Sequence, residues 1–122
     1  MPNLSREDLL ASALVDVAIE SWRFLRVMER HTDGLDAEQQ RRAVSRCAYF
    51  RKQLTDALEG VELRLVALEG SRYGPGLAAS AVNADDFPSE DDLIVDQTIE
   101  PVVMGPAGVV RAGTVTLRRP IG

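Results

Sequence analysis

The sequence has few residues of the kinds that build metal centres, disulfides and aromatic cores. Its 122 residues include one cysteine, Cys47, one histidine, His31, and 5% aromatic residues. A single cysteine excludes a disulfide within the chain and is typical of a reducing compartment, so we expect a cytoplasmic protein. One cysteine and one histidine are also too few for a zinc site of familiar composition. We therefore expect neither a metal nor a cofactor.

Long hydrophobic runs and a signal sequence are missing as well. No segment reaches the roughly 18 consecutive apolar residues that a membrane span needs. The N-terminus lacks the basic-then-apolar order of a signal peptide. The formal net charge of −5 disfavours nonspecific binding to nucleic acid. We expect neither a membrane nor a nucleic acid among the partners.

Proline is absent between Pro2 and Pro75, and five prolines follow from Pro75 onward. Because proline blocks helix interiors, the first part of the chain can form long helices and the second cannot. Glycines gather at the boundary, in residues 70–76. The sequence therefore predicts an α+β protein, in which residues 1–70 form a helical dimerisation region and residues 71–122 form a small β domain.

Two helices are predicted before this boundary. The first begins at Ser5, where Asp8 completes a capping box, and ends near Arg30. It carries apolar and small residues alternately four and three apart, at Leu10, Leu14, Val17, Ser21, Phe24 and Met28. The second begins at Asp36, with Gln39 as its capping partner, and is predicted to continue to Glu69.

The second helix repeats the same alternation over four heptads, which is typical of a coiled-coil seam. We predict a homodimer through this seam, although helix one could instead fold back and cover it. Gly60 lies inside the run and opposes the helix by about 1 kcal/mol relative to alanine. The predicted seam residues are Val44, Cys47, Leu54, Leu58, Val61, Leu65 and Leu68.

Short strands are predicted after the boundary. Residues 93–95 and 98–104 are rich in β-branched residues. Residues 109–117 are predicted to form a further strand, with Val115 and Leu117 on one face and Thr114 and Thr116 on the other. Pro101 favours a sheet edge or a bulge. The turn chemistry of residues 105–108 joins the last two runs into a hairpin, which is too small to be stable alone.

No arrangement of residues indicates an enzyme. His31 lies at a predicted helix end, where a capping role is the simpler interpretation, and Cys47 lies on the apolar seam, where cysteine is usually a core residue. The acidic segment 83–92 lacks the ligand spacing of a calcium loop. A small enzyme with a site between the hairpin and loop 74–92 stays an alternative, and it predicts that Asp85, Asp86 or Glu90 is essential.

The C-terminal third resembles the β domain of the GrpE family, the nucleotide exchange factors of Hsp70 chaperones. Residues 110–117, Val-Arg-Ala-Gly-Thr-Val-Thr-Leu, are similar to the last strand of the family, with Gly113 in place of a second small residue. A strand and a glycine-containing turn precede that strand, and a long helix precedes the β region, as in the family. The likeness covers roughly residues 54–119, but the Gly-Tyr pair usual in the family falls at Val102-Val103.

This resemblance implies a mechanical function without catalytic residues. A GrpE-like dimer presses its β domain on one lobe of an Hsp70-type ATPase, opens the nucleotide cleft and releases ADP. The residues implied for the partner face are Arg111, Val103, Met104 and Val110. The alternative function is a non-enzymatic adaptor that dimerises through helix two and binds partners through its β module, without any effect on nucleotide release.

Overall fold

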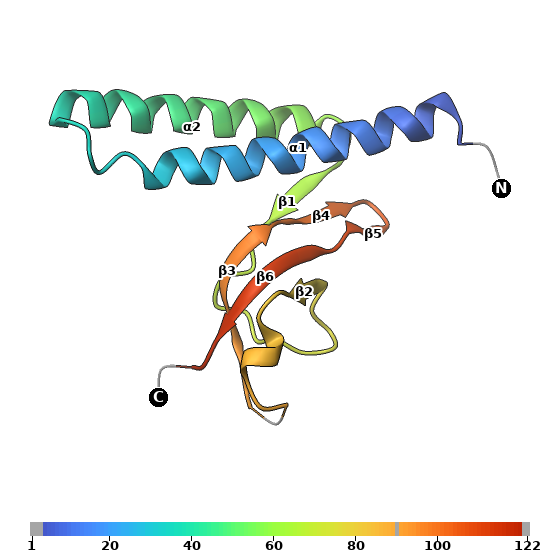
Figure 1. Cartoon of the computed structure of the whole chain (residues 1–122). Helices are drawn as coiled ribbons and strands as arrows, with labels where there is room; N and C mark the ends of the chain where they lie inside the picture. Colours follow the sequence, from blue (N-terminus) through green and yellow to red (C-terminus); the bar gives the residue numbers. More distant parts are fainter. Residues whose placement is uncertain (1–3, 90, 121–122) are drawn as a thin grey trace. The chain divides into compact units, whose positions relative to one another are not determined.

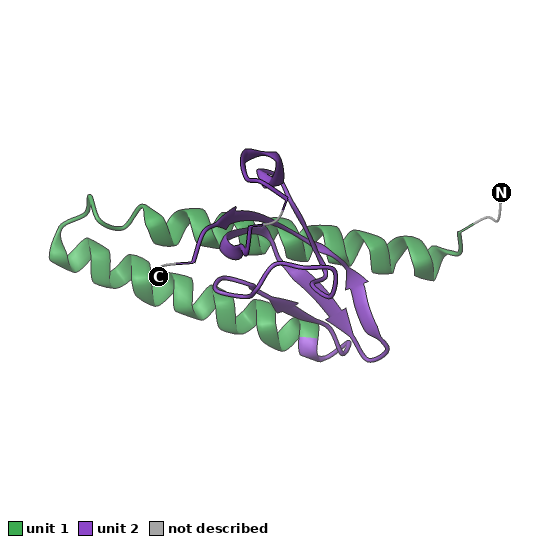
Figure 2. Ribbon diagram, turned by 90° about the horizontal axis from the view of Figure 1, so that it is seen from below, with its two compact units in different colours: residues 1–58 green, residues 59–122 purple. Residues whose placement is uncertain are grey.

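The computed structural model describes residues 4–89 and 91–120, and these residues fall into two compact units (Figure 2). Unit 1 ends at Leu58 and contains two helices, whereas unit 2 begins at Glu59 and contains six short strands. The predicted α+β class is confirmed (Figure 1). The division falls before the predicted boundary at residue 70, because the second helix is shorter than predicted.

Unit 1 is a helical hairpin, with α1 spanning Arg6–Arg30 and α2 spanning Ala37–Glu59. The predicted capping box at Ser5 is confirmed: the Asp8 amide donates to Ser5 Oγ over 3.1 Å, and the Ser5 amide donates to Asp8 Oδ2 over 3.3 Å. The predicted cap of α2 is confirmed too, since the Gln39 amide donates to Asp36 Oδ1 over 2.8 Å. Both helices therefore begin where side chains satisfy otherwise unpaired amides.

The predicted continuation of the second helix to Glu69 is wrong, because α2 ends at Glu59. Gly60 follows directly, and Glu62 takes a positive φ of 60°, which no helix accommodates. The chain then enters β1, Arg64–Val66, where Leu65 lies opposite Val103 of β4, Val102–Gly105. Pairing with β4 satisfies backbone groups of β1, and Leu65 is half-buried there.

Unit 2 contains two three-stranded sheets. In the first, β4 (Val102–Gly105) lies between β1 and β5 (Gly108–Arg111), and all neighbours are antiparallel. In the second, β6 (Gly113–Arg118) lies between β2 (Ala79–Ala81), which is parallel to it, and β3 (Ile94–Glu100), which is antiparallel. A short 3-10 helix, Ala84–Asp86, follows β2. The predicted hairpin forms as β4 and β5, joined by the turn at residues 105–108. It is shorter than predicted, because the predicted runs 98–104 and 109–117 are each divided between the two sheets.

The core of unit 2 lies on one face of β3 and β6. Val115 and Leu117 alternate inward along β6, as predicted, and Leu93 and Val95 meet them. Leu68, Tyr73 and Phe87 are among the side chains that pack around this cluster. Pro101 is fully buried where the chain passes from β3 in one sheet to β4 in the other. Because proline has no amide to donate, this crossing point loses no ladder hydrogen bond.

Candidate interaction surfaces

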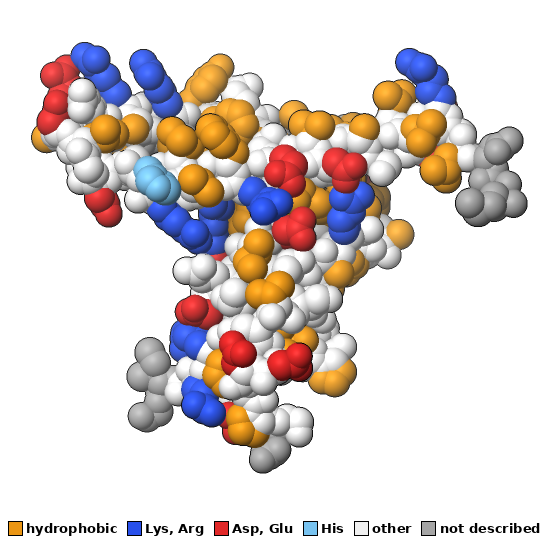
Figure 3. Space-filling view, viewed as in Figure 1, with side chains coloured by type: hydrophobic (Ala, Val, Ile, Leu, Met, Phe, Trp, Pro, Cys, Tyr) orange, Lys and Arg blue, Asp and Glu red, His pale blue; other side chains and the backbone are white. Residues whose placement is uncertain are grey.

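Unit 1 exposes a row of hydrophobic side chains along α1. Phe24 is 64% exposed, Val17 63% and Leu10 57%. The row has the four-and-three spacing noted in the sequence, and we call it the α1 stripe: Leu10, Leu14, Val17, Ser21, Phe24 and Met28. Exposed hydrophobic side chains are visible along both helices in the space-filling view (Figure 3). A patch of this kind on a folded protein is typical of an interaction site.

The stripe adjoins α2 through two hollows within the hairpin. One, of about 330 Å³, is lined by Phe24, Met28, Cys47 and Phe50, together with neighbouring residues of both helices. The other, of about 430 Å³, lies further toward the N-terminus of α1 and is again lined by Phe24 and Phe50. These two aromatic rings therefore belong to one apolar face to which both helices contribute.

The seven predicted seam residues do not share one helix. Val61, Leu65 and Leu68 lie in unit 2, and Leu68 packs against its core. Leu58 is buried, and Cys47 and Leu54 are half-buried. An ion pair between Arg51 of α2 and Glu29 of α1 joins the two helices. Val44 is the predicted α2 seam residue that stays exposed.

The β hairpin holds the four residues implied for a partner face, but they differ in accessibility. Val103 is 1% exposed, so it cannot contact a partner. Met104 and Arg111 are half-buried. Val110 is 51% exposed, and the neighbouring Val109, which the sequence argument did not select, is 50% exposed. The accessible part of this hairpin is therefore the edge strand β5.

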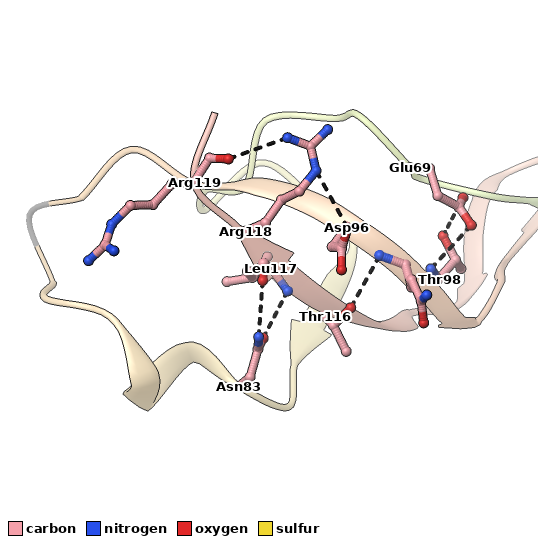
Figure 4. A network of polar contacts seen from close by, with 9 residues as sticks. Glu69, Asn83, Asp96, Thr98, Thr116, Leu117, Arg118 and Arg119 are labelled. Carbon is pink, nitrogen blue, oxygen red and sulfur yellow. Dashed lines mark hydrogen bonds and ion pairs between the residues drawn. The ribbon is translucent and has the colours of Figure 1, made fainter. Parts of the chain in front are cut away.

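A polar network holds the loops of unit 2 against β3 and β6 (Figure 4). The hydroxyl of Thr98 accepts from the Leu68 amide over 2.9 Å and donates to Glu69 Oε2 over 2.7 Å. Asn83 bonds both backbone groups of Leu117: its Oδ1 accepts from the amide over 2.8 Å, and its Nδ2 donates to the carbonyl over 3.0 Å. This network is structural, and no sequence spacing indicated it.

The side chains considered for chemistry are separate from one another. Nδ1 of His31 donates to the carbonyl of Val27 over 2.8 Å at the end of α1, in agreement with a capping role. Asp91 pairs with Arg119 over 2.9 Å, and Asp85 and Asp86 lie in the 3-10 helix. Glu90 lies outside the described residues. Within residues 4–89 and 91–120, no three His, Cys, Asp or Glu residues are grouped as a metal site requires.

One arginine in unit 1 has a shifted pKa. Partial burial, followed by the positive charge of Arg30, lowers the pKa of Arg26 from its ordinary value. The guanidinium of Arg26 lies 4.6 Å from the centre of the Trp22 ring. This cation–π contact stabilises the charged form in an environment that disfavours it.

Comparison with known proteins identifies no relative: the chain matches no family model, no curated protein and no solved structure. In the part of the chain that the structure describes, neither helix has the length and apolar character to cross a membrane. Two exposed surfaces, the α1 stripe and the edge strand β5, are therefore the candidate functional sites.

Proposed function

We propose that this chain is a protein-binding protein without catalytic activity, and that it acts as a GrpE-like co-chaperone on an Hsp70-type ATPase. The observation that carries the proposal is the edge strand β5. It presents Val109 and Val110, each about half exposed, directly before Arg111. Val110 and Arg111 belong to the segment, residues 110–117, that resembles the last strand of the GrpE β domain.

The order of the elements supports this proposal. A helical region precedes a β unit, and within that unit a strand, a glycine-containing turn and the motif-bearing strand follow one another. The motif itself is divided between β5 and β6, since Ala112 interrupts the pairing. Burial of Val103 restricts the proposed partner face to Val109, Val110 and the half-buried Met104 and Arg111.

The mechanism needs only differential affinity. If the β unit binds the ATPase more tightly with its nucleotide cleft open than closed, it shifts the population toward the open state and accelerates ADP release. A tenfold preference corresponds to about 1.4 kcal/mol of binding energy, which a few apolar contacts supply.

The test measures release of fluorescent ADP from a purified Hsp70-type ATPase with and without the full chain. We expect acceleration by the wild type and loss of it in Val110→Asp. Val82→Asp is the matched control, since Val82 is 63% exposed in the same unit and lies outside the hairpin. Equal release rates with and without the wild-type chain, at concentrations where it binds the ATPase, would overturn the exchange activity and favour the adaptor.

A further inference from the structure

We propose that the α1 stripe is a homodimer seam, against which α1 of a second copy packs in antiparallel orientation. This inference is independent of the Hsp70 partner, because it concerns unit 1 and a different set of residues. It also differs from the seam predicted on helix two, several of whose residues are buried or half-buried within the chain.

Helix α1 has more apolar surface than is buried within the chain. A surface helix usually turns a single apolar stripe toward the core. In α1 the buried residues are Val15, Ala18, Ile19 and Leu25, which are not members of the stripe. The stripe keeps the four-and-three alternation of a coiled-coil seam over residues 10–28, yet its five apolar members are all exposed.

Charge along α1 favours a second copy in antiparallel orientation. From Arg6 to Glu20 the helix carries four acidic residues and one basic residue, whereas from Ser21 to Arg30 it carries three arginines and one glutamate. A parallel pair would align halves of like charge. An antiparallel pair places the acidic half of each helix beside the basic half of the other, which is electrostatically complementary.

Side-chain size favours the same orientation. With a two-fold axis midway between residues 17 and 21, Val17 lies opposite Ser21 of the second copy, and Leu14 lies opposite Phe24. Leu10 then lies opposite Met28. Because of the two-fold symmetry, each of these three contacts occurs twice in the dimer. Each layer of the seam therefore pairs two side chains of different kinds, one from each copy. A parallel pair would instead place Ser21 against Ser21 and Phe24 against Phe24, leaving a void beside an overfilled layer.

The exposed area of the stripe supplies more than half of what a standard interface buries. Five roughly half-exposed side chains of this size provide on the order of 500 Å² per copy, and a standard interface buries about 800 Å² per partner. The adjoining face around Phe50 and its two hollows adds to the available area.

The oligomeric state is the first measurement, by light scattering of the full chain across a dilution series. We expect twice the monomer mass of 13.4 kDa. Val17→Glu and Phe24→Glu are expected to raise the dissociation constant about a hundredfold, because each would bury a charge in the seam. Both side chains are well exposed in the single chain, so the helical circular dichroism signal should persist.

Val44→Glu and Tyr49→Glu are matched controls, since these α2 side chains are 54% and 67% exposed and lie outside the stripe. Both of these control variants should stay dimeric. A monomeric wild type would overturn the proposal and leave the stripe to a different partner. Dissociation by Val44→Glu but not by Val17→Glu would also overturn it, in favour of a seam on α2.

Cross-linking tests the orientation. In a Cys47→Ser background, a Leu10→Cys chain is mixed with a Met28→Cys chain of different mass and oxidised mildly. The antiparallel register predicts a disulfide between the two different chains. The two Leu10 positions would lie about 27 Å apart, at 1.5 Å per residue. Disulfides only between identical chains would instead show a parallel pair and overturn the antiparallel assignment.

Discussion

The hydroxyl of Thr98 is the best-defined point at which the stability of unit 2 can be tested. Thr98 is 3% exposed, and its hydroxyl joins the Leu68 amide to the Glu69 carboxylate. Thr98→Val retains the shape of the side chain and removes only this hydrogen-bonding group. The Leu68 amide then has no acceptor at a partly buried position, whereas Glu69 is exposed and can be solvated by water.

The expected cost follows from this asymmetry. An unsatisfied buried donor costs about 1–3 kcal/mol, and the lost bond to a hydrated carboxylate adds little. We expect Thr98→Val to lower the free energy of unfolding of unit 2 by about 2 kcal/mol. Since 1.4 kcal/mol corresponds to a factor of ten, amide protection in β6 should fall about 30-fold.

Native-state hydrogen exchange of the full chain measures this effect at the amides of Val115 and Leu117. Thr116→Val is the matched control, because its hydroxyl accepts from the Gln97 amide over 3.2 Å at an exposed position that water can reach. We expect about a twofold change or less there, equivalent to under 0.5 kcal/mol. Thr98→Ser should keep the Leu68 amide protected. Equal losses for Thr98→Val and Thr116→Val would refute the assigned role of the buried hydroxyl.

Two further substitutions test local features of each unit. Ser5→Ala removes the capping box of α1 and should cost about 1 kcal/mol, measured as faster exchange of the Asp8 amide, whereas Ser5→Thr should retain protection. Gly113→Ala should destabilise unit 2 by more than about 2 kcal/mol, because a Cβ at this position would lie 2.7 Å from the carbonyl oxygen of Glu100. Gly74→Ala is its control, with open space around the added methyl group, and thermal unfolding of unit 2 should be nearly unchanged by it.

Local signals made the helix beginnings and the hairpin predictable. Ser5 with Asp8, and Asp36 with Gln39, are short-range pairs whose geometry is complete within one turn, so sequence alone identified them. The turn at residues 105–108 is similarly local. The end of α2 was not predictable in this way. Val61, Leu65 and Leu68 continue the helical spacing, yet Leu63 and Leu65 also alternate as in a strand, and only pairing with β4 decides between the two.

The accessibility of the interaction surfaces could not be predicted from local sequence signals either. The spacing of the α1 stripe was visible in the sequence, as was the spacing on helix two. Spacing identifies an apolar stripe but not what covers it, because burial depends on residues distant in the chain. In the helical hairpin of unit 1, Leu58 is buried on α2, whereas Val17 and Phe24 are exposed on α1. The exposed apolar stripe is therefore on α1, whereas the predicted seam was on the second helix.

The two proposals can fail separately, because no residue belongs to both surfaces. Val17→Glu changes unit 1 and Val110→Asp changes unit 2, and each unit has its own buried core residues. If dimerisation only raises the effective concentration of β units, Val17→Glu should weaken ADP release by reducing avidity and leave the intrinsic effect of one β unit intact. Acceleration should then return when the concentration of the monomeric variant is raised. A loss that no concentration restores would mean that the partner face itself requires two copies.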